Sequence, residues 1–360
     1  VFAALTSGDN NVAVGFGALT ANTTGHSNTA VGKSSLVAVT EGFSNTAVGF
    51  DAGKAITTGD YNTALGMNAM NSGTTANNNT VLGVGSGTSM TDGIGNTLTG
   101  MVTSIALTTG DYNVSAGYAS GYAITTGDEN ICIGNSAALA LTTGSDNIAI
   151  GTNALNTSQT TTGEVAIGFE ALKAASSAGY NVAVGYQAAT AVTSAIGVVV
   201  MGYQAGDAIT TGDTNICMGG FSMDGGAGKT GYGGTHIGHA GHRTSTSGNF
   251  NSSMGIDTFK NPTTGAANTC LGAGSGNVIT TGSENTLVGR TAGVAISTGN
   301  NNVCVGNGTG NTGVTPGGGI STVSNRIILG NTSSTHAHIQ IDWTVASDKR
   351  DKTDVTPLDM

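Results

Sequence analysis

The chain is built from a 17-residue repeat, and this period constrains its fold more than any other feature. We number each repeat from its first residue, which is usually Asn at position 1, with Gly at position 5. The repeats begin at Asn11, Asn28, Asn45, Asn62, Asn79, Asn96, Asn113, Asn130, Asn147, Glu164, Asn181, Val198, Asn215, Asn251, Asn268, Asn285 and Asn302, with a two-residue insertion after Asn215. A fixed period in this range is typical of a solenoid, whose units are too small to fold alone.

The typical repeat is N-T-A-V-G-F-D-A-G-K-A-I-T-T-G-D-Y, as it stands at residues 45–61. Position 2 is mostly β-branched, position 3 is small, and position 4 is mostly large and apolar. Residues two apart point to the same face of a strand, so positions 2 and 4 share one face. The T-T-G-D segment that closes the repeat predicts a tight corner. Gly in that corner allows a positive φ, and Asp and Thr can bond neighbouring backbone groups.

Other fold classes fit the composition poorly. The 60 glycines interrupt every helical pattern. A hydrophobic content of 38% with only 9% charged residues is not that of a disordered chain. Collagen is excluded because Gly does not recur every third residue. We therefore predict an all-β fold, a parallel β-solenoid or β-roll.

The repeat also predicts dimensions and assembly. About 18 coils at roughly 4.8 Å each give a rod on the order of 85 Å long, in which Asn can ladder with its copies in adjacent coils. Such a short coil is thin, and aromatic residues make up only 5% of the chain. A single chain is therefore expected to leave an apolar face uncovered, and wrapping three copies around one axis would bury it. We predict a homotrimer.

The four cysteines, Cys132, Cys217, Cys270 and Cys304, all occupy position 3, where Ala usually stands. Neighbouring members are separated by about 10 Å or more of stacked coils, which exceeds the span of a disulfide. We interpret them as small buried residues rather than as a disulfide set or a zinc site.

Charge and motifs exclude several functions. A formal charge of −10 with scattered basic residues argues against a nucleic-acid partner. No apolar run approaches the roughly 20 residues of a membrane span, and no signal peptide opens the chain. Catalytic signatures such as G-x-S-x-G, H-E-x-x-H and the P-loop are missing, so we expect neither an enzyme nor a cofactor. Because the chain begins with Val1, we expect that a segment precedes it.

Three regions follow from the pattern. Residues 1–324 form the repetitive shaft, with insertions near 219–234 and 307–324. Residues 325–346 are expected to form capping strands and a connector. Residues 347–360 lie beyond this pattern, and the resemblance described next implies that they are the truncated start of a further module.

The N-T-A-V-G repeats resemble the heads of trimeric autotransporter adhesins and the shafts of phage tail fibres. The C-terminal segments N-R-I-I-L-G at 325–330 and W-T-V-A-S-D-K-R-D-K-T-D-V-T-P-L at 343–358 resemble the entry into the endosialidase-type intramolecular chaperone that ends many phage tail fibres. This resemblance implies a virion tail fibre that contacts a host surface glycan or outer-membrane receptor and other tail or baseplate proteins.

The same resemblance implies self-cleavage. In the chaperone family a Ser and a Lys five residues later cut the preceding peptide bond, and these residues fall on Ser347 and Lys352. The cut would separate Ala346 from Ser347, with the lysine activating the serine hydroxyl. The alternative is that residues 347–350 are only a solvated charged turn.

Receptor contacts are expected where the repeat is broken. The largest breaks are 219–234, which carries Phe221, Met223 and Tyr232, and the loop 307–324. The aromatic residues of the first break can stack on sugar rings or simply pack the loop.

Metal sites have weaker support. His336 and His338 lie two apart on an expected strand, and in a trimer they would supply six imidazoles. The spacing of His236, His239 and His242 sends them to different sides, which disfavours a shared metal. The corner aspartates could form a calcium ladder, but solvated turn residues are the better interpretation. These aspartates are Asp60, Asp111, Asp128 and Asp213.

The sequence thus predicts a phage tail-fibre component, a trimeric rod that mediates attachment to the host surface. The first alternative is the head of a bacterial trimeric autotransporter adhesin. The second is a purely structural or ice-binding solenoid, although Glu41, Asp92 and Gln159 interrupt the threonine rows that ice binding needs.

Overall fold

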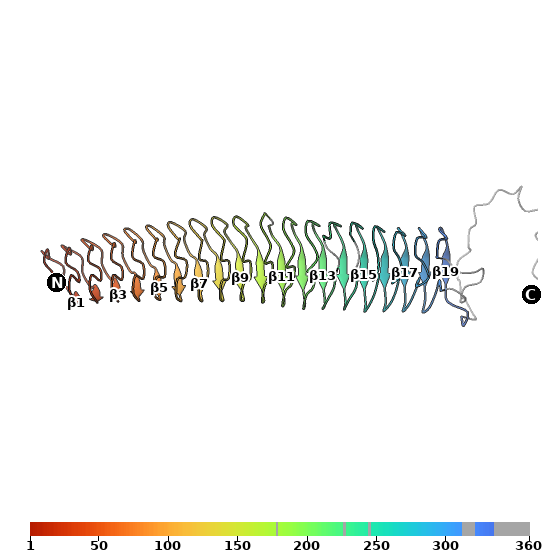
Figure 1. The fold of residues 1–360 in the computed structure, drawn as a ribbon, viewed down its shortest axis with the longest axis horizontal. Coiled ribbons are helices and arrows are strands. Elements are labelled where there is room, and N and C mark those ends of the chain that lie inside the picture. The colour runs from red at the N-terminus through yellow and green to blue at the C-terminus, as the bar shows by residue number, and fades with distance from the viewer. Residues whose placement is uncertain (178, 226–227, 244–245, 312–320, 335–360) are drawn as a thin grey trace, which may run out of the picture.

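The computed structural model describes residues 1–177, 179–225, 228–243, 246–311 and 321–334. Its strands are short and lie side by side in a single file of coils, with the two ends of the file far apart (Figure 1). The strands are β1 (Val12–Val14), β2 (Thr29–Val31), β3 (Thr46–Val48), β4 (Thr63–Leu65), β5 (Thr80–Leu82), β6 (Thr97–Thr99), β7 (Val114–Ala116), β8 (Ile131–Ile133), β9 (Ile148–Ile150), β10 (Val165–Ile167), β11 (Val182–Val184), β12 (Val199–Met201), β13 (Ile216–Met218), β14 (Thr235–Ile237), β15 (Ser252–Met254), β16 (Thr269–Leu271), β17 (Thr286–Val288), β18 (Val303–Val305) and β19 (Ile327–Leu329). No helix long and apolar enough to cross a membrane occurs within these described ranges.

The strands form one parallel sheet in which each strand pairs with the next along the chain. Equivalent positions pair, as in Ala47 with Ala64. The prediction of an all-β parallel solenoid is confirmed. Paired residues are farther apart in sequence where the chain carries insertions: Ile216 pairs with Thr235, and Val303 pairs with Ile327. The extra residues therefore leave the register of the sheet intact. Strand β19 therefore continues the sheet into the segment that we assigned to the cap.

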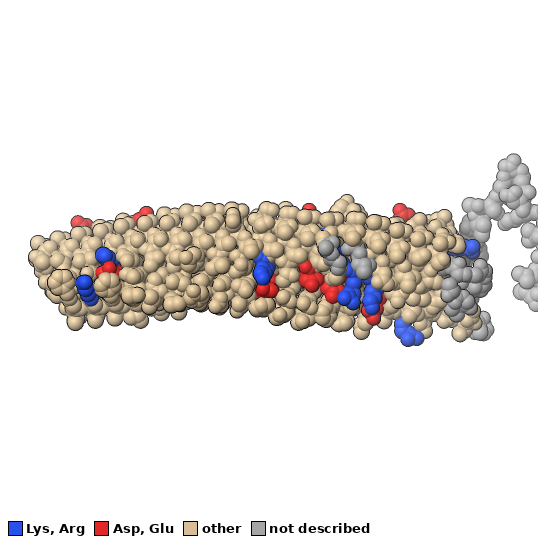
Figure 2. Space-filling model, viewed as in Figure 1, with Lys and Arg blue, Asp and Glu red and all other residues tan. Residues whose placement is uncertain are grey.

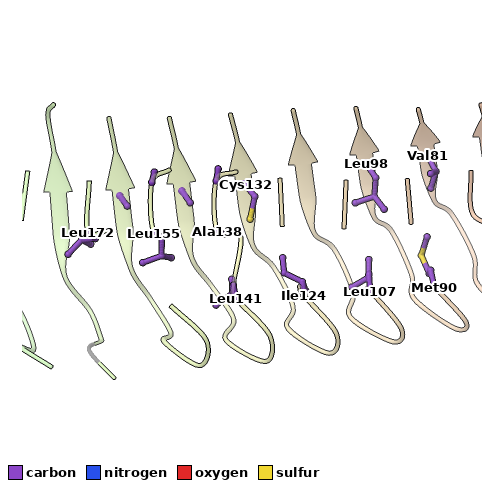
Figure 3. Close-up of a cluster of buried hydrophobic side chains, with 14 of the residues drawn as sticks. Val81, Met90, Leu98, Leu107, Ile124, Cys132, Ala138, Leu141, Leu155 and Leu172 are labelled. Carbon is purple, nitrogen blue, oxygen red and sulfur yellow. The ribbon is translucent and has the colours of Figure 1, made fainter. Parts of the chain in front are cut away.

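The core lies between the strands and the turns that face them. The middle residue of each strand, at position 3 of the repeat, points inward. In Figure 3 the strand residues Val81 and Leu98 face Met90 and Leu107 on the opposite side of the coil. Large and small residues alternate to fill this space. A Cβ added to Gly276 or to Gly293 would collide with the side chain of Leu287, at 3.0 and 2.6 Å, so a large strand residue needs glycine beside it.

All four cysteines are buried free thiols at position 3, as predicted. Burial raises the pKa of the Cys217 thiol to about 12. Such thiols stay protonated and unreactive at neutral pH.

The asparagines at position 1 form the predicted ladder inside the stack. Asn130 donates from Nδ2 to Oδ1 of Asn113, at 3.0 Å, and to the carbonyl oxygen of Gly144 in its own coil, at 2.9 Å. Its own Oδ1 accepts the backbone and side-chain N–H groups of Asn147, at 3.1 and 3.0 Å. Each buried amide is satisfied from both neighbouring coils, which fixes the register of the solenoid.

The ladder adapts where Val198 replaces Asn. In the preceding coil Asn181 donates to the carbonyl oxygen of Ala195, and the equivalent acceptor for an asparagine at 198 is the carbonyl oxygen of Gly212. In its place Asn215 donates to Gly212 at 2.9 Å as well as to Gly231 at 2.7 Å. The neighbouring rung thus satisfies the carbonyl that Val198 leaves open.

Glu164 also replaces Asn, and its buried carboxyl group accepts two N–H groups of Asn181, both at 3.2 Å. Burial raises the pKa of Glu164 to about 7, and the hydrogen bonds from Asn181 oppose that shift. This carboxyl group therefore makes the stability of the rod depend on pH.

We expect Glu164→Asn to remove that dependence. An unfolded Glu titrates near about 4.3, so between that pH and about 7 the folded chain binds more protons, and its stability falls as pH rises. At about pH 8 the variant should be more stable by up to about 3 kcal/mol, with little difference near pH 4. Denaturant unfolding at both pH values measures this, with the exposed Glu41→Gln as control. An unchanged pH slope in Glu164→Asn would contradict the expectation.

The corner that closes each coil differs from its prediction in one respect. The positive φ belongs to the residue before Asn, for example Tyr61 at 57°, and not to the glycine of T-T-G-D. Gly59 is needed for space instead, because a Cβ there would collide with the carbonyl oxygen of Ala76 in the next coil. Close stacking of coils, rather than backbone conformation, selects this glycine.

Candidate functional site

The outer face of the sheet, formed by positions 2 and 4, is the largest candidate surface. None of these positions in the described strands carries a charged residue. The face carries exposed threonines, such as Thr46 and Thr97. Its exposed large apolar residues are Val12, Val14, Leu65, Ile133, Met201, Ile216, Met218, Met254, Leu271, Val305, Ile327 and Leu329. The prediction that positions 2 and 4 share one face is confirmed, and that face points outward. Monomeric proteins rarely expose contiguous apolar surface on this scale, so it indicates an interaction site.

Charged side chains are sparse on the side of the rod seen in Figure 2 and gather in small groups. Ion pairs within one coil join Lys54 to Asp51 at 2.9 Å and Lys173 to Glu170 at 2.6 Å. Their partners neutralise each other, so they supply little net field for a charged ligand.

The three receptor candidates of the break at 219–234 do not form one surface. Met223 is buried, with its sulfur 3.1 Å from that of Cys217, so it cannot touch an external partner. Phe221 is half-buried and packs edge-on against Tyr203. Tyr232 is exposed and packs against Phe250 at another corner of the coil. Only Phe221 and Tyr232 remain as surface candidates.

A buried polar cluster lies beneath this break. Lys229 pairs with Ile209 of the preceding coil and fills a core position that holds an apolar residue in most other coils. Its ammonium group donates to the carbonyl oxygens of His242, at 3.0 Å, and Arg243. His236 is also buried, and its ring lies 3.9 Å from that of His242. The apolar core is thereby split into two parts, one ending at Met223 and one starting at Phe259.

Burial sets the protonation of this cluster. Burial lowers the pKa of Lys229 to about 8, while Cys217, Asp224 and Asp207 act to raise it. It also lowers the pKa of His236 to about 3, and the pKa of His242 falls well below its usual range. At neutral pH both imidazoles are neutral, and Lys229 carries the buried charge that the two carbonyl groups stabilise.

The expectation that the three histidines lie on different sides holds only for His239, which is exposed. It is wrong for His236 and His242, because both side chains enter the core, where their rings meet. Among the described residues, no three His, Cys, Asp or Glu side chains are grouped so that they could hold a metal ion.

The corner aspartates bond the backbone. Oδ1 of Asp60 accepts the N–H of Phe43 at 2.9 Å, and Oδ1 of Asp111 accepts that of Ile94 at 2.7 Å. Asp128 and Asp213 make the same bond. They therefore tie one coil to the next.

The threonines before this corner use their hydroxyl groups in the same way. Thr57 donates to the carbonyl oxygen of Thr74 at 3.0 Å, and Thr108 donates to that of Thr125 at 3.0 Å. Position 14 forms an outward hydroxyl row, which the exposed Glu41 and Asp92 interrupt. A second row of threonines stands at position 2 of β2 to β6, on the outer face of the sheet.

The proposed cleavage residues Ser347 and Lys352, and the histidines His336 and His338, lie outside the described residues. Reasoning from the sequence missed Lys229 as a core residue. The repeat gives no direct signal for it, because a two-residue insertion would align Gly228 with Ile209, whereas the structure pairs Ile209 with Lys229.

Comparison with known proteins adds no relative. No protein-family model matches the chain, and no curated protein matches it significantly.

Proposed function

We propose that the chain is a structural and receptor-binding component of a phage tail fibre, a homotrimeric rod in the virion that attaches to the host cell surface. The single observation that carries this proposal is the uncharged, mostly apolar face that positions 2 and 4 present from β1 to β19, with threonine or serine at its other positions. A rod with such a face gains stability when copies bury it against one another, and closed cyclic symmetry lets every copy do so.

The assignment to a phage tail fibre has a second support, which is the resemblance of residues 343–358 to the entry of the intramolecular chaperone. The adhesin-head alternative uses the same trimeric face and would be followed by a stalk and a membrane anchor instead of a chaperone. Native and denatured masses of the full gene product separate the two. A native mass of three chains, each ending at Ala346, supports the tail fibre. A trimer that keeps its C-terminus removes the self-cleavage, and a monomer overturns the trimeric rod.

The apolar face is tested by the double variant Ile150→Asp/Ile167→Asp, which places carboxylates at position 4 of β9 and β10. We expect the native mass to fall from three chains to one, because each buried charge would lose its hydration without gaining a partner.

The matched control is Thr126→Asp/Thr143→Asp, at exposed position 14, where Glu41 and Asp92 occur naturally. This variant should keep the mass of three chains. A trimer that survives Ile150→Asp/Ile167→Asp would show that another surface holds the copies together.

A further inference from the structure

An aromatic row runs along one corner of the rod from β10 to β14. It consists of Phe169, Tyr186, Tyr203, Phe221 and His239, with ring centroids 5.0, 5.3, 5.2 and 5.6 Å apart in that order. Each ring comes from the first or second residue after the glycine that ends a strand. At roughly 4.8 Å per coil the row is about 20 Å long.

The rings of this row leave part of their faces uncovered. Phe169, Tyr186 and Tyr203 are nearly parallel, with interplanar angles of 14° and 9°. Their centroid spacing exceeds the contact distance of about 3.5–4.0 Å, so the rings must be slipped past one another. Tyr186 is 44% exposed and Tyr203 is 50% exposed although each has a ring on both sides. The row therefore offers a continuous, tilted aromatic surface to a ligand.

A row of polar side chains accompanies the rings at the next position. Gln187 donates from Nε2 to Oε2 of Glu170 at 2.9 Å, and Gln204 donates to Oε1 of Gln187 at 2.9 Å. Each Gln amide has a further N–H donor and acceptor lone pairs beyond this ladder. Lys173 pairs with Glu170 at 2.6 Å, so the carboxylate at the end of the ladder is neutralised.

We propose that the aromatic row and its glutamine ladder bind an extended, uncharged glycan lying along the rod. This inference rests on the proposed attachment function and names the class of its ligand. A pyranose ring has one apolar C–H face, which carries partial positive charge and is attracted to the negative face of an aromatic ring. Its hydroxyl groups point sideways, where neutral amides can exchange hydrogen bonds with them. A linear glycan repeats along its length, as the coils do.

Other ligands fit these residues less well. A nucleic acid or an acidic glycan needs cations, and Lys173 is already paired with Glu170. A second copy of the chain is the other possible occupant. However, the row lies past the glycine that ends each strand and borders polar residues, whereas the face that we assign to self-association is the sheet itself.

The test is an array of neutral and acidic oligosaccharides probed with the full chain, with the native mass of each sample recorded. We expect binding to a subset of neutral oligosaccharides. Tyr186→Ala/Tyr203→Ala should weaken it by about tenfold or more through loss of the ring surface. Tyr186→Phe/Tyr203→Phe keeps the rings and should retain most of the affinity. Met101→Ala/Tyr118→Ala alters the same coil position outside the row and should bind like the natural chain.

Three results would overturn the proposal: no neutral oligosaccharide bound, binding unaffected by Tyr186→Ala/Tyr203→Ala, or loss of the oligomer in that variant. The last would assign the row to contact between copies. The native mass separates this inference from the proposed function. A monomeric chain that binds neutral glycans through the row would keep the glycan site and overturn the trimeric rod.

Discussion

Replacing Gly151 with Ala is expected to destabilise the rod locally by about 3 kcal/mol or more. Gly151 has φ at +131°, a backbone conformation that other residues rarely adopt. A Cβ there would lie 2.5 Å from the carbonyl oxygen of Gly168 in the next coil, and backbone cannot move aside as a flexible side chain can. The coils would have to separate, with loss of hydrogen bonds between β9 and β10.

Hydrogen exchange of the amides in β9 to β11 measures this loss, together with the denaturant midpoint. Gly197→Ala is the matched control. Gly197 also has a positive φ, at 68°, but the nearest atom to an added Cβ lies 3.6 Å away, on Thr214. Equivalent positions accept Tyr61 and Tyr180 in the same conformation. Equal effects of the two substitutions would show that backbone strain, not coil spacing, selects the glycine at position 5.

Replacing Asn130 with Ala is expected to cost on the order of 4 kcal/mol. The substitution leaves the carbonyl oxygen of Gly144 without the Nδ2 donor of Asn130, and Oδ1 of Asn113 keeps only the backbone N–H of residue 130. It also removes the acceptor for two N–H groups of Asn147. All of these groups are buried, so water cannot replace the lost bonds without opening the coil.

The control is Asn135→Ala, at an exposed position in the same coil where the amide oxygen accepts only the hydroxyl of Ser136. Its unfolding midpoint should stay close to that of the natural chain. If Asn130→Ala were tolerated as well as Asn135→Ala, the ladder would not contribute to stability. Neighbouring asparagines would then have to re-bond, as Asn215 does beside Val198.

Much of the fold could be predicted because one rule governs every coil. In a parallel stack each residue meets its own copy above and below, so only side chains that tolerate a copy of themselves persist at a position. Asn does so by donating and accepting at once, which is why the spacing of Asn45 and Asn62 already predicted the pairing of Thr46 with Thr63. The small residues at position 3 likewise predicted the inward side, including Cys132.

The contents of the break were not predictable to the same degree. Met223 was expected at the surface because it stands in a glycine-rich segment, yet its backbone keeps the coil geometry and its side chain enters the core. Lysine usually lies at the surface, but the aliphatic part of the Lys229 side chain is buried in the core and its ammonium group donates to two carbonyl oxygens. The aromatic row escaped notice because its members come from successive coils, distant in sequence, and only stacking brings them together.

The identity of neighbouring coils has a consequence for how such a gene can change. Unequal recombination that adds or removes a whole repeat joins equivalent positions, so the new junction pairs as Ile148 with Val165 does. Inserting or deleting a single residue would instead shift the repeat and place a large side chain where the coils need glycine. Extra residues persist where the strands on either side of them keep their pairing, as Ile216 does with Thr235. The length of the rod can therefore change by copying whole repeats, while point changes at a corner alter the side chains that its surface presents.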